Sequence, residues 1–472
     1  MRANALFFVL LTAASVSCGG SDTSPGAQPP PAGTGGANGW AGGSGNQGGA
    51  SGSGAATDDS GAGRGADASG GASGADGSAD GAPPSDRGPT PAVPGSNFPF
   101  PQNRENARCS YPAYKNADMR AAFERWKRET ITRDGAGGHV RVKRLAHDGG
   151  LEVNSTVSEG IAYGMLIAVY MNDQPLFDEL WKYEQLWLDG NGLMDWYINA
   201  AGTERLGTGA ASDADEDMAW ALLMADRQWG GRGTLSDTYL ALAQRQIDLI
   251  WQHEIHESKL MKPGDQWGDW DTINPSYFAP SYYRTFGEVT GQVARWEAVI
   301  KTVYDTIDNT LNDTNGNTAN GLVPAWCTSR GAPRSVFAGA PTHYQYDSCR
   351  TPFRIALDWC LRGEPRAKIY VMKTSQFFSG IGARNIVDGY ELNGSPRPAN
   401  GSGQSAAFVG PAAVGAMADP AHKSLLDEGY AAVASYELLV GGEYYDGSWT
   451  VLSLLMLTGN FLDYTKETPV TR

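Results

Sequence analysis

The sequence predicts an all-α protein, an (α/α)6 barrel of six inner and six outer helices. Two observations predict this fold. From residue 116 onward, six amphipathic segments alternate with six that are apolar or small-residue-rich on nearly every side, and strand alternation is hard to find. Because each outer helix carries the chain back antiparallel, all inner helices run the same way. Their N-termini should therefore lie on one face of the barrel.

The outer helices are expected where apolar side chains recur at helical spacing among charged ones. In 293–311, for example, the apolar positions Val293, Trp296, Val299, Ile300, Val303 and Ile307 share one helical face. The six segments of this kind are 116–130, 176–188, 235–253, 293–311, 364–379 and 421–436.

The inner helices are expected where no polar stripe interrupts the apolar surface. These segments are 158–171, 213–226, 277–289, 351–361, 405–417 and 448–458. In the first, Ser155, Thr156 or Ser158 is expected to act as the N-cap, which places Glu159 in or beside the first turn. A carboxylate beside a buried helix is costly unless it is paired or opens into a cleft, and an acid that caps the helix is the alternative.

The N-terminal region has a different composition. Residues 1–18 hold Arg2, the apolar run Ala5–Leu11 and small residues before Cys18, which indicates a secretory signal. A lipid anchor on Cys18 is expected, although Ser15 replaces the usual leucine of the lipoprotein motif, so plain secretion stays open. Residues 19–95 contain almost no large apolar side chain and are expected to be a disordered linker before a folded domain at 96–472. We expect an exported monomer, either a lipoprotein of the outer membrane or cell surface or a secreted protein.

Charge and cysteine usage exclude two classes of site. The net charge of −15 argues against a nucleic-acid partner, which would require a basic face. The cysteines other than Cys18 lack the paired spacing of a zinc site, so no metal site is expected. Export permits disulfides, and all three pairings as well as free thiols remain open for Cys109, Cys327, Cys349 and Cys360.

Three acids stand at or just before the starts of expected inner helices: Glu159 at the first, Asp213 at the second and Asp347 before the fourth. In the barrel they would converge on one face. Aromatic side chains gather in the loops of that face, where flat rings can stack on sugars and acids can bind hydroxyl groups. They are Trp196, Tyr197, Trp267, Trp270, Tyr277, Phe278, Trp326, Tyr344, Tyr346, Tyr444 and Tyr445.

Two carboxyl groups suffice to cleave a glycosidic bond, and no metal or organic cofactor is required. Two other functions compete with this one. The run of acids from Asp213 to Asp217 is similar to a box that binds magnesium and diphosphate, and a non-catalytic protein could use the same acids to bind glycans.

Several motifs together resemble glycoside hydrolase family 8. They include Ala-Ser-Asp-Ala-Asp-Glu-Asp-Met-Ala-Trp at 211–220, Val-Ser-Glu-Gly-Ile-Ala-Tyr-Gly at 157–164 and Lys-Pro-Gly-Asp-Gln-Trp-Gly at 262–268. The similarity runs from about residue 100 to 465. It implies that 96–472 is the catalytic domain of an inverting enzyme with an (α/α)6 barrel. The family acts on β-1,4-linked glucans, xylans and chitosan.

The resemblance also implies roles for single residues. Glu159 falls on the proton donor, Asp213 on the substrate-positioning aspartate and Asp347 on the base of the cellulase-like branch, in a Tyr-x-Tyr-Asp-x-x-Arg stretch that ends at Arg350. The implied activity is that of an endo-β-1,4-glucanase, with xylan, xylo-oligosaccharides or chitosan as alternative substrates. Gln266 stands where such members often have arginine. The residues expected to bind substrate are Trp196, Tyr197, Trp267, Tyr277, Tyr346, Arg350, Tyr444 and Tyr445, and Tyr346 and Arg350 are also expected to keep Asp347 ionised.

Overall fold

The computed structural model describes residues 95–145, 151–268, 271–336, 341–399, 403–439 and 442–470. The predicted signal at 1–18 with Cys18, the predicted linker apart from residue 95, and Trp270 lie outside these ranges. Within them, no helix combines the length and apolarity needed to cross a membrane.

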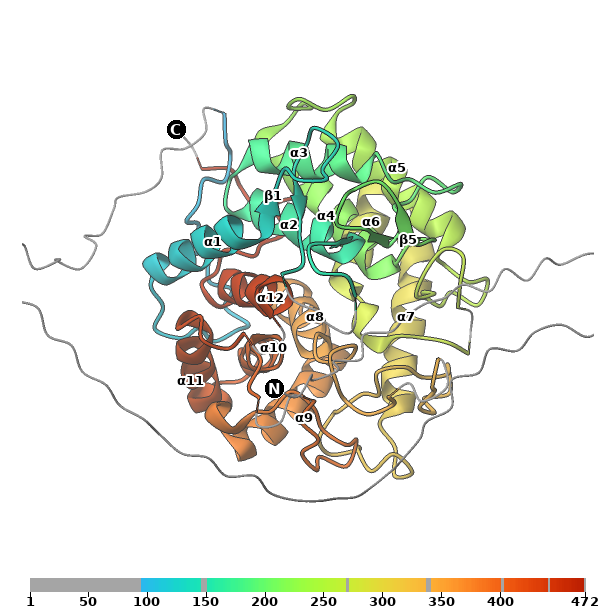
Figure 1. Cartoon of the computed structure of the whole chain (residues 1–472). Coiled ribbons are helices and arrows are strands. Elements are labelled where there is room, and N and C mark those ends of the chain that lie inside the picture. The colour runs from blue at the N-terminus through green and yellow to red at the C-terminus, as the bar shows by residue number, and fades with distance from the viewer. Residues whose placement is uncertain are drawn as a thin grey trace, which may run out of the picture. The chain divides into compact units, whose positions relative to one another are not determined.

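The described residues form the predicted (α/α)6 barrel, with the outer helices at the periphery of Figure 1. The outer helices are α1 (Asn116–Thr130), α3 (Gln174–Glu184), α5 (Tyr239–His253), α7 (Val293–Thr310), α9 (Pro365–Ile381) and α11 (Lys423–Ala434). The inner helices are α2 (Ser158–Tyr170), α4 (Ser212–Trp229), α6 (Pro280–Thr290), α8 (Thr351–Leu357), α10 (Ala406–Ala416) and α12 (Gly442–Leu457). Helix α2 packs against α4 and α12, and α10 packs against α8 and α12, which follows the expected order around the ring.

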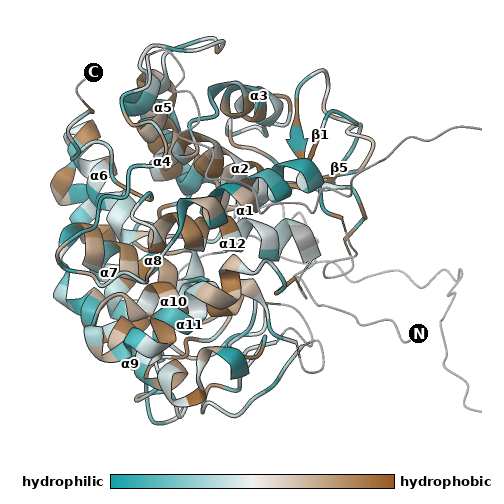
Figure 2. Cartoon of the chain, turned by 90° about the vertical axis from the view of Figure 1, so that its left-hand side faces the viewer, coloured by the Kyte–Doolittle hydropathy of each residue, from teal (hydrophilic) through white to brown (hydrophobic). Residues whose placement is uncertain are grey.

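Burial separates the two sets of helices as the sequence predicts. All residues of α8 and α10 are buried, and in α2 Glu159 alone is partly exposed. Figure 2 shows α10 towards the hydrophobic end of the scale, whereas α1 and α3 carry long hydrophilic stretches. Small residues let the two layers approach closely: a Cβ added to Gly429 of α11 would lie 2.6 Å from the Cβ of Ala413 in α10.

Five short strands were not foreseen, because strands of two or three residues leave no readable alternation. Strands β1 (Ile131–Thr132) and β2 (Arg141–Val142) pair antiparallel. Strand β4 (Tyr197–Ile198) pairs antiparallel with both β3 (Thr156–Val157) and β5 (Arg205–Gly207). The second sheet matters for the site, because it ties the residue before α2 to the loop that carries Trp196.

Two helix boundaries differ from the prediction near the site. Helix α12 begins six residues earlier than expected, at residue 442, so Tyr444 and Tyr445 lie on a helix and not in a loop. Helix α6 begins at Pro280, a residue suited to the first turn, and the 3-10 turn Pro275–Tyr277 precedes it.

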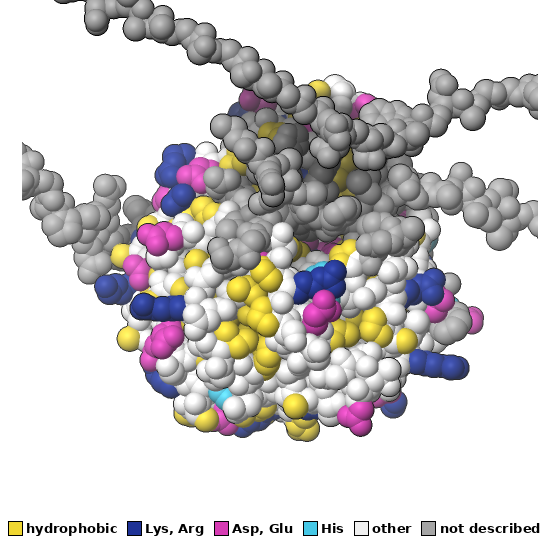
Figure 3. Space-filling model, turned by 60° about the horizontal axis from the view of Figure 1, so that its bottom comes forward, with side chains coloured by type: hydrophobic (Ala, Val, Ile, Leu, Met, Phe, Trp, Pro, Cys, Tyr) yellow, Lys and Arg dark blue, Asp and Glu magenta, His cyan; other side chains and the backbone are white. Residues whose placement is uncertain are grey.

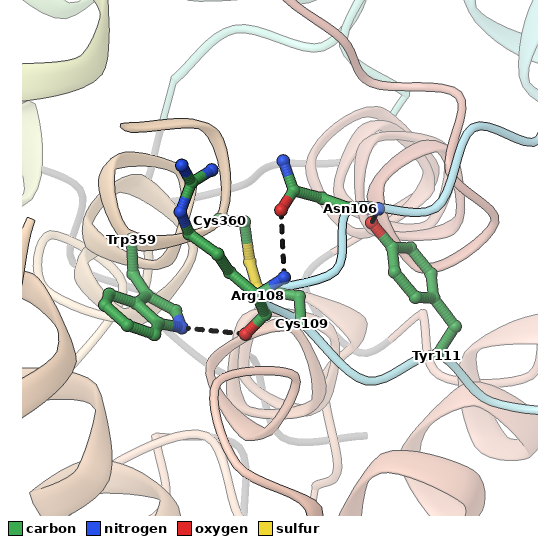
Figure 4. The surroundings of a disulfide bond; sticks show 6 residues. All are labelled: Asn106, Arg108, Cys109, Tyr111, Trp359 and Cys360. Carbon is green, nitrogen blue, oxygen red and sulfur yellow. Dashed lines mark hydrogen bonds between the residues drawn. A yellow bond between two sulfur atoms is a disulfide. The ribbon is translucent and has the colours of Figure 1, made fainter. Parts of the chain in front are cut away.

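The four cysteines of the described residues form one disulfide and leave two free thiols, so none of the three complete pairings occurs. Cys109, in the segment before α1, is bonded to Cys360 in the π-helical turn that follows α8 (Figure 4). The neighbouring Trp359 donates a hydrogen bond to the carbonyl oxygen of Arg108 at 3.1 Å. Cys327 and Cys349 are free and buried. The disulfide therefore joins segments that are 251 residues apart.

On the outer surface, acidic and basic side chains lie beside one another on the face shown in Figure 3. The large hydrophobic side chains exposed among the described residues are spread over four helices or strands, the turn after α3 and one terminal segment: Leu206, Leu240, Val293, Ile369, Leu186 and Val470. Such scattered exposure is ordinary for a folded protein.

Candidate active site

One hollow lies at the N-terminal ends of α2 and α4 and beside the loop before α8. Glu159, Asp213 and Asp347 all line it, as their positions in the barrel predicted. The other lining residues are Arg144, Leu151, Val157, Ser158, Trp196, Ala211, Trp267, Tyr277, Trp326, Arg350 and Tyr444.

Arg350 connects two of the three acids. Its Nη1 donates to Glu159 Oε2 at 2.5 Å and to Asp213 Oδ2 at 2.6 Å. Its Nε donates to Ser276 Oγ at 3.2 Å, and its guanidinium lies 4.9 Å from the ring centroid of Tyr277. The side chain is 2% exposed, so the two carboxylates supply the charge that a buried guanidinium needs.

The start of α2 differs from the expected cap. The N-cap is Val157, and it makes no side-chain capping bond. Ser155 and Thr156 instead donate to the carbonyl oxygens of Glu152 and Val142. Because β3 pairing fixes the backbone here, the hydroxyl groups are not needed as caps.

Glu159 points into the hollow and holds two donors on its two oxygens. Tyr444 donates to Oε1 at 2.5 Å while Arg350 holds Oε2. The pKa of Glu159 is raised to about 7, because burial penalises the charged form and outweighs Arg350, with Asp213 raising the pKa further. Glu159 thus lies in the first turn of α2, as expected, and both of its carboxylate oxygens accept hydrogen bonds from side chains that line the hollow.

The four acids at the start of α4 point to different partners. Asp213 meets Arg350, Asp215 accepts from Gln246 at 3.0 Å, Glu216 accepts from Tyr283 at 2.7 Å, and Asp217 accepts from both Nη atoms of Arg354. Asp217 follows Asp213 by four residues, and Arg354 follows Arg350 by four. The Asp217–Arg354 ion pair therefore lies one helical turn deeper than the Asp213–Arg350 pair. The acids therefore do not form the shared box that the alternative of a magnesium–diphosphate site requires.

Asp347 accepts its side-chain hydrogen bonds from the described residues through one of its two carboxylate oxygens. Its Oδ2 accepts from Gln345 Nε2 at 2.9 Å and from Trp326 Nε1 at 3.3 Å. Burial raises the pKa of Asp347, while Gln345, Arg350 and Trp326 oppose the shift. The expected hydrogen bond from Tyr346 is wrong: the Tyr346 hydroxyl donates to Asp388 Oδ2 at 3.2 Å. The charge of Arg350 acts in the expected direction on the pKa of Asp347, but burial has the larger effect.

The predicted aromatic residues divide into two groups. Trp196, Trp267, Tyr277 and Tyr444 line the hollow, together with Trp326. Trp326 is 5.3 Å from Trp267 and 6.0 Å from Tyr277 between ring centroids, so the three rings form one wall.

Three predicted substrate-binding tyrosines lie outside the lining and are buried. Tyr197 accepts a hydrogen bond from the backbone of Glu152, and Tyr445 donates to the carbonyl oxygen of Tyr346. Sequence position alone could not separate them from their neighbours, because adjacent residues on a strand or helix point in different directions.

Arg144 is a lining residue that the sequence did not reveal. It is 1% exposed, and its guanidinium lies 5.9 Å from the ring centroid of Tyr444. It follows β2 in a stretch with several basic residues, and no pattern there distinguishes it from Lys143.

Comparison with known proteins decides the family. The model of the family described as Glycosyl hydrolases family 8 matches residues 98–459, most of the barrel. The chain belongs to this family. It is therefore a glycoside hydrolase.

Named members of family 8 are similar over most of their length. Endoglucanase A of Acetivibrio thermocellus is 40% identical over 351 residues, which cover 73% of this chain and 70% of that protein. Endoglucanase 2 of Ruminiclostridium josui is 38% identical over 381 residues and 77% of both chains. A solved apo structure of β-1,3-1,4-glucanase from Paenibacillus sp. X4 covers 77% of this chain and 99% of its own, with 29% identity and a TM-score of 0.69.

One family 8 neighbour is more distant. The structure of Rex8A from Paenibacillus barcinonensis complexed with xylose covers 74% of this chain and 94% of its own, at 23% identity and a TM-score of 0.61. This likeness shows the shared fold alone.

The departure from family 8 at Gln266 has a local partner. Gln266 is exposed, and its side-chain amide donates to Asp189 on the loop after α3. Trp267, the next residue, still lines the hollow.

Proposed function

We propose that this enzyme is an inverting endo-β-1,4-glucanase in which Glu159 is the proton donor, Asp347 the base and Asp213 the residue that positions substrate and acid. The observation that carries the proposal is the placement of Glu159 and Asp347 on one hollow walled by aromatic rings. The endoglucanase names of the similar proteins support the choice of β-1,4-glucan.

Glu159 has the properties of a general acid. With a pKa of about 7 it keeps its proton in mildly acidic solution, and burial is the main cause. After the proton passes to the glycosidic oxygen, the carboxylate that remains accepts hydrogen bonds from Tyr444 and Arg350. These donors lower the cost of the charge that develops as the bond breaks.

Asp347 has the properties of a general base for water. Both of its side-chain hydrogen bonds among the described residues fall on Oδ2, which leaves Oδ1 for a water molecule. As that water attacks the anomeric carbon, its proton moves to Asp347 while the bond to the leaving oxygen breaks. A single displacement of this kind inverts the anomeric centre and requires about 6.5–9.5 Å between the two carboxyl groups.

The aromatic wall determines how the polymer is held. The partly exposed rings of Trp267 and Tyr277 can stack on the flat faces of pyranose units, and the buried ring of Trp326 packs behind them. Trp196 lines the same hollow from the loop before β4. Glucan, xylan and chitosan share the flat pyranose ring, so xylan or chitosan remain the alternative substrates.

Two measurements test the proposal. Proton NMR during hydrolysis of a β-1,4-linked gluco-oligosaccharide should show the α-anomer first, and the D347N variant should lose several orders of magnitude in kcat while remaining folded. A β-anomer as the first product would exclude Asp347 as a base for inversion. Higher kcat/KM on xylan or chitosan than on every β-glucan would replace the substrate and leave the mechanism in place.

We also propose that the enzyme is an exported monomer that reaches the cell surface through a lipid on Cys18. Support comes from the composition of residues 1–18 and from the spacer-like composition of 19–95. Labelled fatty acid should be incorporated into the wild-type protein and not into C18A. Wild-type protein that carries no labelled fatty acid and is released into the medium would indicate plain secretion instead.

A further inference from the structure

Asp265 connects a lining loop to the start of α4 without itself lining the hollow. It lies in the loop 262–268, two residues before Trp267, and is 7% exposed. Its Oδ1 accepts from the backbone N–H of Ala210 at 2.8 Å, and its Oδ2 accepts from Asn191 Nδ2 at 2.6 Å. One carboxyl group therefore joins three segments.

The segment that Asp265 holds leads directly into the site. Ala210 is followed by Ala211, a lining residue, and by Ser212 and Asp213 at the start of α4. Ser212 strengthens the contact between the loop 262–268 and the start of α4, because its N–H donates to the carbonyl oxygen of Pro263 at 3.2 Å and its hydroxyl donates to the carbonyl oxygen of Lys262 at 2.6 Å.

The ring of Trp267 packs where the loop 262–268 meets the segment before α4. A Cβ added to Gly264 would lie 2.2 Å from Trp267 Nε1 and 2.4 Å from the carbonyl oxygen of Ala210. Glycine is therefore required at position 264, since any side chain would displace the indole or the backbone of Ala210 before α4. The position of the ring depends on how the loop meets Ala210.

A second aspartate holds the loop from the other side. Asp189 accepts from the N–H groups of Asn191 at 2.8 Å and Leu193 at 3.2 Å, and from the side chain of Gln266. It also shares a hydrogen bond with Asp265. Burial and this contact raise the pKa of Asp265, whereas this contact and the N–H donors lower the pKa of Asp189 against the opposing effect of burial.

We propose that Asp265 is a positioning residue that fixes Trp267 relative to Asp213, and that it thereby sets the affinity for the sugar unit that stacks on Trp267. The inference rests on the proposed function, because it needs a sugar at that ring. It assigns no chemical step to Asp265.

Kinetics of D265A, W267A and the double variant on a soluble β-glucan test this role. D265A should raise KM about tenfold and change kcat less than about threefold, and it should add almost nothing to the effect of W267A, because it acts through that ring. D265N should recover only part of the wild-type KM, since its amide oxygen can still accept from Ala210 N–H while its amide nitrogen can no longer accept from Asn191.

Asp178 provides a matched control. It is also buried, at 2% exposed, and it accepts from Thr234 N–H, Thr234 Oγ1 and Tyr239. It does not line the hollow. D178A should lower Tm and leave KM unchanged, which separates positioning from general loss of stability.

The outcomes are distinguishable. An unchanged KM in D265A, or effects of D265A and W267A that add, would overturn the role of Asp265 alone. A normal KM in W267A would overturn the proposed sugar contact as well. If D265A does not fold, N191A can replace it, because this variant removes one hydrogen-bond donor to Asp265. N191A should raise KM about threefold and should add no effect to that of W267A. An unchanged KM in N191A would overturn the positioning role of Asp265.

Discussion

Removing the charge of Asp213 should move the whole pH–rate profile to lower pH. Glu159 must be protonated to act, so activity is lost as pH rises through its pKa of about 7. Asp347 must be ionised, so activity is lost as pH falls through its own raised pKa. Asp213 raises both values, and D213N should therefore shift both limbs downward.

The structure gives the size of the shift at Glu159. Its Oε2 and Asp213 Oδ2 both lie against Arg350 Nη1, which puts them about 5 Å apart at most, where two unit charges interact by about 3 kcal/mol at an effective dielectric of about 20. At about 1.4 kcal/mol per pKa unit this is about two units. Because Glu159 remains 16% exposed, we expect the basic limb to move by about one to two units.

The assay is kcat/KM on a soluble β-glucan from pH 4 to 9, with D178N as a control that removes a buried carboxylate away from the hollow. If D213N is too slow to assay, the Glu159 carboxyl can be titrated directly by NMR with labelled glutamate. A basic limb or a titration midpoint that matches wild type would refute the reasoning, because the charge of Asp213 would then have no effect on the acid.

Three further predictions concern binding, the disulfide and the N-terminal region. W267A should raise KM or lower kcat/KM by about tenfold or more, since a stacked ring is worth about 1–3 kcal/mol, and wild-type kinetics would exclude the ring from the substrate path. The C109S/C360S variant should unfold at a Tm several degrees lower, because a disulfide that closes a loop of 251 residues stabilises the fold by about 2–5 kcal/mol. Its kcat/KM at 25 °C should stay unchanged. A loss of activity in the folded variant would assign the disulfide a role in the site. A chain that begins at residue 95 should keep its activity on soluble substrate, because Phe98 is fully buried and stacks on Tyr464 at 4.2 Å, so the packed domain starts there; failure to fold would show that earlier residues are structural.

The sequence determined the architecture and the identity of the three acids. Hydrophobic periodicity is a property of local segments, and each inner helix is buried by its own composition, so the twelve helices could be placed before any contact was known. The sequence also located Glu159, Asp213 and Asp347, because a barrel with parallel inner helices brings their N-termini to one face.

Only the tertiary structure decided which side chains reach the hollow. The direction of a side chain depends on the rotation of its helix and on neighbours that are far away in sequence. Arg350 meets Glu159 across 191 residues and Asp213 across 137, and no local pattern encodes that meeting. The same holds for Tyr346, which turns to Asp388, and for Cys109, which pairs with Cys360. Periodicity identifies the buried face of each helix, whereas the packing of whole helices fixes which buried atoms touch.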